Sequence, residues 1–189
     1  MKNLKLLALL WVVLVAWTLA WCNNKNTDTE NSGDLIIEDV TSNYDAVINY
    51  NDALVEIASL CAIDENVALA DYENGAENIK TAIDNAISQC QSSIDQINEL
   101  WDWEGDSSLK DWIIKILNLD IQYFSKFNEL LPYLANDELP ENEADKYNAL
   151  VEEITALDQE MEAVNNDLID IQAQFAANHG YELAPTVEE

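Results

Sequence analysis

Cys61 and Cys90 are placed so that they could react with each other, because they lie on opposite sides of a predicted turn between helices. The turn is expected at Asn74-Gly75, since Asn and Gly tolerate the left-handed conformation that ends helices. Cys61 precedes Gly75 by 14 residues, and Cys90 follows it by 15. In an antiparallel hairpin the two thiols would lie at one level and could form a disulfide. Alternatively, both are small buried core residues, because each also falls on an apolar stripe.

An acidic loop between two predicted helices has the beginning of a calcium-binding pattern. Asp102, Glu104 and Asp106 alternate as the first ligands of an EF-hand loop do. Position six of such a loop should be Gly and position twelve Glu, but Ser107 and Ile113 stand there. The three acids are therefore weak candidates for a metal site. We expect the protein to use no cofactor, with bound Ca²⁺ as the alternative.

Few residues in this sequence have the spacing of a catalytic site. The only histidine, His179, lies beside the predicted C-terminus of the last helix, where a cation is favourable. Ala176 stands three residues before it, which excludes the Glu-x-x-His motif of di-iron bundles. The sequence contains no glycine-rich phosphate loop and no HExxH motif. We therefore expect that the protein is not an enzyme.

Four amphipathic stripes must position these residues, because apolar side chains recur at three- and four-residue steps, as they do on one face of a helix. The expected helices are about 42–73, 76–103, 108–135 and 141–178. From Leu150 the steps alternate four and three, which is typical of coiled-coil packing. The sequence predicts an all-α protein, an elongated up-down-up-down four-helix bundle with coiled-coil-like packing over residues 42–179.

The segments outside the bundle have different compositions. Residues 22–41 are rich in Asn, Thr, Asp, Glu and Ser, which predicts a disordered polar linker, and residues 180–189 are expected to form a tail. Near the start, two lysines precede an apolar run from Leu6 to Ala20. This run is short for a membrane span, which needs ~20 apolar residues, but suits the core of a signal peptide. We assign residues 1–21 to that signal.

The junction Leu19-Ala20-Trp21-Cys22 resembles the lipobox of bacterial lipoproteins, in which an aliphatic residue and small residues precede a Cys. Trp21 departs from the pattern, because a small residue is expected there. The resemblance implies that signal peptidase II cleaves before Cys22 and that this residue carries the lipid, which anchors the chain stably in a membrane. It also implies a mature domain in the cell envelope, outside the cytoplasm. The alternative is an ordinary signal peptide that happens to contain a Cys.

Tryptophan is frequent in this chain and glycine is rare, with six Trp against four Gly. Three of the tryptophans, including Trp21, lie in the leader, where glycine would give an ordinary lipobox. Some bacterial lineages read UGA as glycine, so we hypothesise that some of these positions are mistranslated Gly. UGG codons in the leader would refute the hypothesis.

Around the acidic loop, we expect Trp101 and Trp112 to cap the core. The alternative is that they form, with Trp103, an aromatic patch for a carbohydrate or protein partner.

The charge of the chain restricts its partners. It has 37 acidic side chains against eight lysines and no arginine, giving a net charge of −29. This excludes a sequence-independent nucleic-acid binder, since affinity for phosphate requires a basic surface. We expect a lipid-anchored, extracytoplasmic lipoprotein that serves as a non-enzymatic interaction or structural module, with an envelope protein as partner. The alternative is a sensor domain that binds a ligand or a divalent cation, which the charge would attract.

Overall fold

Helices make up nearly all of the part of the chain that the computed structural model describes, which is residues 43–73, 78–134 and 143–180. The predicted signal peptide, the predicted lipidation residue Cys22 and the predicted polar linker lie outside the described residues, as does the chain from residue 181 onward. The turn expected at Asn74-Gly75 also lies outside them.

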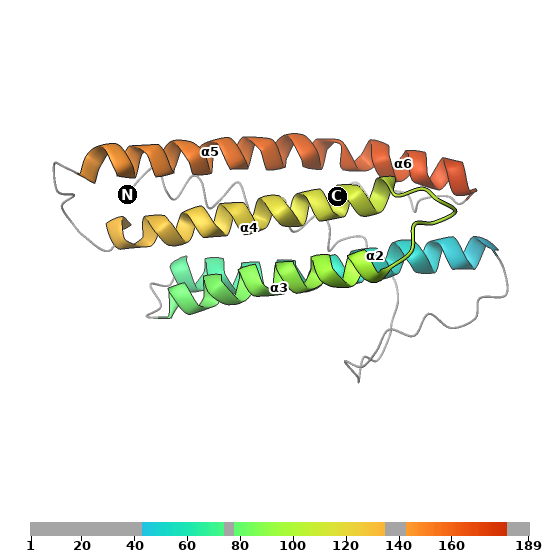
Figure 1. The fold of residues 1–189 in the computed structure, drawn as a ribbon, viewed down its shortest axis with the longest axis horizontal. Coiled ribbons are helices and arrows are strands. Elements are labelled where there is room, and N and C mark those ends of the chain that lie inside the picture. Colours follow the sequence, from blue (N-terminus) through green and yellow to red (C-terminus); the bar gives the residue numbers. More distant parts are fainter. Residues whose placement is uncertain (1–42, 74–77, 135–142, 181–189) are drawn as a thin grey trace, which may run out of the picture.

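The helices run back and forth as long rods (Figure 1). They are α2 (Asn43–Glu73), α3 (Ile79–Glu99), α4 (Ser108–Leu134), α5 (Ala144–Asn166) and α6 (Leu168–His179). In Figure 1, α6 continues the direction of α5, so these two segments together form the fourth rod. The expected all-α class and elongated four-helix bundle are therefore confirmed, and each rod packs beside the next one along the chain.

The second helix is shorter than expected, and its end forms a structured loop. We expected this helix to reach residue 103, but α3 ends at Glu99 because Leu100 is extended, with ψ 144°. Trp103 and Asp106 then pair across a tight turn. Glu104 and Gly105 occupy the turn with φ angles of 51° and 84°, a conformation that glycine adopts readily.

The fourth helix is interrupted at Asp167, although its apolar stripe is continuous in the sequence. The Asp167 N–H donates to the Val164 carbonyl at 3.2 Å, which is a tighter turn than an α-helix makes. The same carbonyl accepts a hydrogen bond from the indole N–H of Trp112 at 2.9 Å. A side chain that inserts into the backbone ladder is a known cause of such interruptions, and this one joins α4 to the fourth rod.

The tryptophans at this end of the bundle are arranged differently from our expectation. Trp112 is buried, as expected, but Trp101 is half exposed, and Trp103 instead caps the core by packing on Tyr50. The three rings therefore do not form an exposed aromatic patch. None of the three has a positive φ, so the backbone at these positions does not require glycine.

One face of α2 is apolar but not covered by the other helices. Leu60, Ile63 and Val67 lie on this face and are 40%, 51% and 51% exposed. The segment Ala46–Ala68 of the same helix is long and apolar enough to cross a membrane by length and composition alone, which is weak evidence because core helices of soluble bundles meet the same criterion.

Candidate functional site

Four side chains that can take part in redox, acid–base or metal chemistry meet inside the bundle. We call them the buried cluster: Cys61, Glu65, Cys90 and Asp120. Cys61 and Glu65 lie one turn apart on α2, Cys90 lies on α3, and Asp120 lies on α4. Their exposed fractions are only 1%, 2%, 0% and 8%. The cluster therefore links three of the four rods through groups that the surrounding apolar core shields from water.

Cys61 and Cys90 are joined by a disulfide, which is one of the two possibilities that their positions in the sequence left open. Their Cα atoms lie 4.5 Å apart, within the range that disulfides require. Because α2 continues without a break to Glu73, the two cysteines stay at one level of the hairpin. Both are also buried in the core, so the alternative interpretation describes their location but not their bonding.

Glu65 lies against the disulfide. Its Oε1 atom is 3.2 Å from Cys61 Sγ and 3.4 Å from Cys90 Sγ. Glu65 is also hydrogen-bonded to the carboxyl group of Asp120. The two sulfur atoms of Cys61 and Cys90 and a carboxylate oxygen of Glu65 lie within 4.8 Å of one another. Among the described residues, no other group of three His, Cys, Asp or Glu side chains has ligand atoms this close together.

The environment of the cluster favours the protonated forms of both acids. Burial raises the pKa of Glu65 well above 4.5, and the nearby Asp120 raises it further. Burial also raises the pKa of Asp120, from 3.8 to about 8. No lysine among the described residues forms an ion pair with either group. At neutral pH the pair therefore holds protons, and one carboxyl group donates to the other.

The sequence analysis did not identify Glu65 or Asp120 as site residues. A signal was present for Glu65, since it follows Cys61 by four residues and so lies on the same apolar stripe. Asp120 lies between Leu119 and Tyr123, which are both buried. An acid at a core position of a helix is uncommon unless it has a partner. The presence of an acidic residue at a position where the pattern expects an apolar one is visible in the sequence alone.

The acidic loop has a structural role in the described protein. Asp102 Oδ1 lies 3.2 Å from Lys110 Nζ, so this carboxylate has a cationic partner. Asp106 Oδ2 lies 3.1 Å from His179 Nε2, and Glu104 Oε2 lies 3.5 Å from His179 Nδ1. The three candidate calcium ligands thus contact side chains of the protein, and two of them tie the loop to the end of α6. Calcium binding there stays a prediction.

Asp106 also supports the start of α4. Its Oδ1 accepts the backbone N–H of Ser108 at 2.9 Å. Burial alone would raise the pKa of Asp106, but hydrogen bonds from Ser108, His179 and Asn178 outweigh it and lower the pKa from 3.8 to about 2. The carboxylate form is therefore the one that the folded state stabilises.

Asp106→Ala is expected to lower the free energy of unfolding by about 1–2 kcal/mol, because it removes a helix cap and the partner of His179. Asp102→Ala is the matched control, since it removes one ion pair with a half-exposed carboxylate, worth about 1 kcal/mol or less, and Lys110 keeps its hydrogen bond to the Leu100 carbonyl. Urea denaturation at neutral pH measures both. The Asp106 contribution should be lost as the pH falls from about 4 to about 2, because the folded-state pKa is depressed. Equal effects of the two substitutions would contradict this role.

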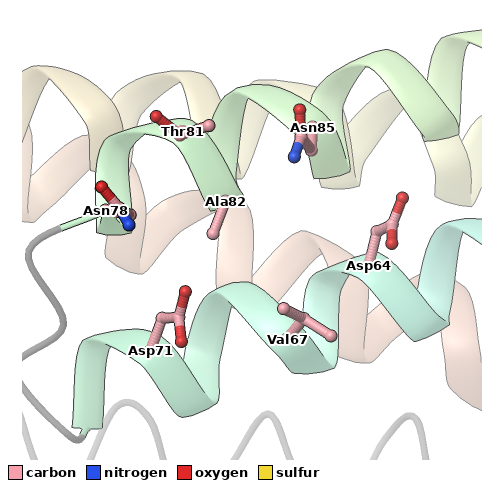
Figure 2. Close-up of a pocket in the computed structure, with 7 residues that line it drawn as sticks. All are labelled: Asp64, Val67, Asp71, Asn78, Thr81, Ala82 and Asn85. Carbon is pink, nitrogen blue, oxygen red and sulfur yellow. The ribbon is translucent and has the colours of Figure 1, made fainter.

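A small hollow lies between α2 and α3 near their connection (Figure 2). Its volume is about 190 Å³, and it is open to solvent. Figure 2 shows Asp64 and Asp71 on α2 across from Asn85 and Thr81 on α3. The lining residues are Asp64, Val67, Asp71, Asn78, Thr81, Ala82 and Asn85. Nothing in its geometry points to a particular ligand, so we assign no site to it.

Comparison of the chain with known protein families, with curated proteins and with solved structures found no match. The functional argument therefore depends on the residues and contacts described above.

Proposed function

We propose that the protein is a lipid-anchored lipoprotein of a bacterial cell envelope, whose helical bundle is a non-enzymatic interaction or structural module outside the cytoplasm. The Cys61–Cys90 disulfide is the observation that carries this proposal. Disulfides form and persist in oxidising compartments and are rare in the cytosol. The lipobox-like sequence before Cys22 supports the same location independently.

Two features of the bundle support a role in contacts with an envelope protein. The long rods give an extended surface, and the exposed face of Leu60, Ile63 and Val67 offers apolar side chains to a partner. The strong negative charge favours solubility and spacing at a membrane surface, and it disfavours nucleic acid as a partner.

Cys22→Ser is expected to release the full chain from the membrane fraction, because serine cannot accept the thioether-linked lipid. In a bacterial host, the native chain should incorporate an alkyne-labelled fatty acid, and a signal peptidase II inhibitor should cause the precursor to accumulate. Fractionation and in-gel detection of the label measure these effects. The Cys61→Ser/Cys90→Ser double variant is the control, since it loses two thiols but keeps the lipidation residue. Absence of label from the native chain would contradict the proposal.

A divalent-cation-binding domain is the second candidate function. It is favoured by the buried cluster, where the candidate ligand atoms of Cys61, Glu65 and Cys90 lie within 4.8 Å of one another, and the two sulfurs become ligands once the disulfide is reduced. It is not favoured by the acidic loop, whose carboxylates contact protein side chains. A thermal-shift series with Ca²⁺ and Mg²⁺ distinguishes these locations, because saturable stabilisation by Ca²⁺ would indicate an oxygen-rich site.

A further inference from the structure

The two buried carboxyl groups need a physical explanation. A buried acid costs free energy unless it is paired, hydrogen-bonded or bound to a metal. Glu65 and Asp120 have each other, but they have no lysine partner among the described residues. Leucine or isoleucine at these two positions would fill the core at a lower cost in free energy. The two acids therefore indicate a function, such as metal binding, that the disulfide form does not perform.

The distances in the cluster are close to those of a tetrahedral metal site. In zinc sites the metal–sulfur distance is about 2.3 Å and the metal–oxygen distance about 2.1 Å, so each S···O edge of the tetrahedron is about 3.6 Å. The two edges from Glu65 Oε1 to the sulfurs are already 3.2 and 3.4 Å. Only the two sulfur atoms must separate, and cleavage of the disulfide allows that.

We propose that the buried cluster is a redox-gated metal site: when Cys61 and Cys90 are reduced, it binds one divalent ion of the zinc type. Both thiolates and the Glu65 carboxylate are the ligands. Asp120 is a positioning residue, because its hydrogen bond to Glu65 fixes the orientation of that ligand. A small-molecule disulfide reverses the step: it takes two electrons from the two thiolates and two protons from solvent to give two small thiols, while the Cys61–Cys90 bond re-forms. This removes two of the three ligands, so the ion is released and Glu65 is protonated again.

The chemistry balances with an external thiol as reductant. Two molecules of a small thiol transfer two electrons and two protons to the Cys61–Cys90 bond, giving two protein thiols and one small-molecule disulfide. The metal ion then displaces both thiol protons and the Glu65 proton to solvent. Two thiolates and one carboxylate around a dication leave a single negative charge, which is far cheaper to bury than three unpaired anions.

The ligand set also predicts selectivity. Thiolate ligands prefer Zn²⁺ and similar soft ions, whereas Ca²⁺ and Mg²⁺ require six or more oxygen ligands. The cluster should therefore discriminate strongly against the two hard cations. This separates it from the calcium site that the acidic loop would form, and it does not depend on lipid anchoring.

Cobalt titration of the reduced full chain tests the proposal, because Co²⁺ reports thiolate ligation and tetrahedral geometry by its absorption. The chain carries Cys22→Ser to remove the third thiol, is reduced during unfolding, and is refolded without oxygen. We expect one equivalent of Co²⁺ to give a sulfur-to-cobalt charge-transfer band and tetrahedral visible bands, and Zn²⁺ to displace it. The disulfide form should give neither band. Absence of the charge-transfer band from the reduced chain would overturn the proposal.

Substitutions test the individual ligands. Cys61→Ser/Cys90→Ser should abolish binding, and Glu65→Gln should raise the Kd at least about tenfold. Asp120→Asn should raise it about tenfold while leaving the charge-transfer band in place. Glu152→Gln removes an exposed acid from α5 and should change nothing. Unchanged binding in Glu65→Gln would overturn the ligand set. X-ray absorption of the zinc-loaded native chain provides a test that needs no variant: two sulfur neighbours of the metal would support the site, and none would overturn it.

Discussion

Asp120→Asn is expected to stabilise the disulfide-bonded protein at pH 8 and to flatten the dependence of its stability on pH. The reason is the raised pKa of Asp120, about 8 in the folded state against 3.8 for an exposed group. Between these two values the folded chain retains a proton that the unfolded chain has released. The unfolded state therefore binds fewer protons, and the stability of the native protein falls as the pH rises through this window.

The expected size of this effect is large. A pKa difference of about four between folded and unfolded states corresponds to on the order of 5 kcal/mol. Glu65 adds to the effect in the same direction, because burial and Asp120 raise its pKa as well. Asparagine keeps the size and hydrogen-bonding capacity of Asp120 but cannot ionise, so it removes one penalty and relieves the repulsion that Glu65 experiences.

Urea denaturation between about pH 5 and about pH 8 measures the prediction. The native chain should lose stability across this range, whereas Asp120→Asn should lose much less. General charge repulsion in so acidic a chain acts in the same direction, so Glu152→Gln is the control: it removes one exposed acid and should leave the native slope nearly unchanged. If Asp120→Asn shows the slope of the native chain, the buried pair does not control the pH response.

The architecture was predictable from the sequence because it depends on the spacing of apolar side chains. Residues such as Leu54, Ile83 and Tyr123 recur at helical intervals, and each is buried. The start of α4 was also within reach, because polar residues cap helices; Pro132 lies inside the last turn of α4, which continues to Leu134. Apolar periodicity is a local property of the sequence. It therefore predicts where the helices lie without information about which helices contact each other.

Details that depend on tertiary contacts were not predictable. The end of α3 at Glu99 is followed by extended backbone at Leu100 and by the packing of Trp103 on Tyr50 of α2. The interruption at Asp167 coincides with a hydrogen bond from Trp112 to the Val164 carbonyl, and these two residues are 52 positions apart in sequence. The spacing of apolar residues within one helix does not show which residues of other helices will contact it. The continuous apolar stripe of the fourth helix therefore predicts one continuous helix.

The candidate site shows the same division. The level match of Cys61 and Cys90 followed from counting residues on either side of one turn, since a hairpin fixes it. Glu65 could have been noticed as an acid on an apolar stripe, but Asp120 becomes its partner only because α4 packs beside α2. The acids of the end loop, by contrast, were considered as ligands because of their spacing, and His179 on α6 provides the contact that the spacing could not reveal.

Reduction of the Cys61–Cys90 bond in metal-free protein is expected to lower the free energy of unfolding by about 3–4 kcal/mol. The bond closes a loop of 29 residues, and the chain-entropy relation for a loop of this size gives that value. In the folded state the cysteines remain packed in the core, so the loss comes mainly from the greater freedom of the unfolded chain. The melting temperature should fall by roughly 10 °C.

Denaturation of the Cys22→Ser chain with and without a phosphine reductant, in the presence of a metal chelator, measures this loss. The Cys61→Ser/Cys90→Ser variant is the control, because it should be no more stable than the reduced chain and should not respond to reductant. A thiol count on unfolded, unreduced protein should find no free Cys61 or Cys90. Two free thiols in that count, or equal stability with and without reductant, would show that the bond does not form in solution. The polar linker should not alter either result, because it precedes the cross-linked hairpin and lies outside the closed loop.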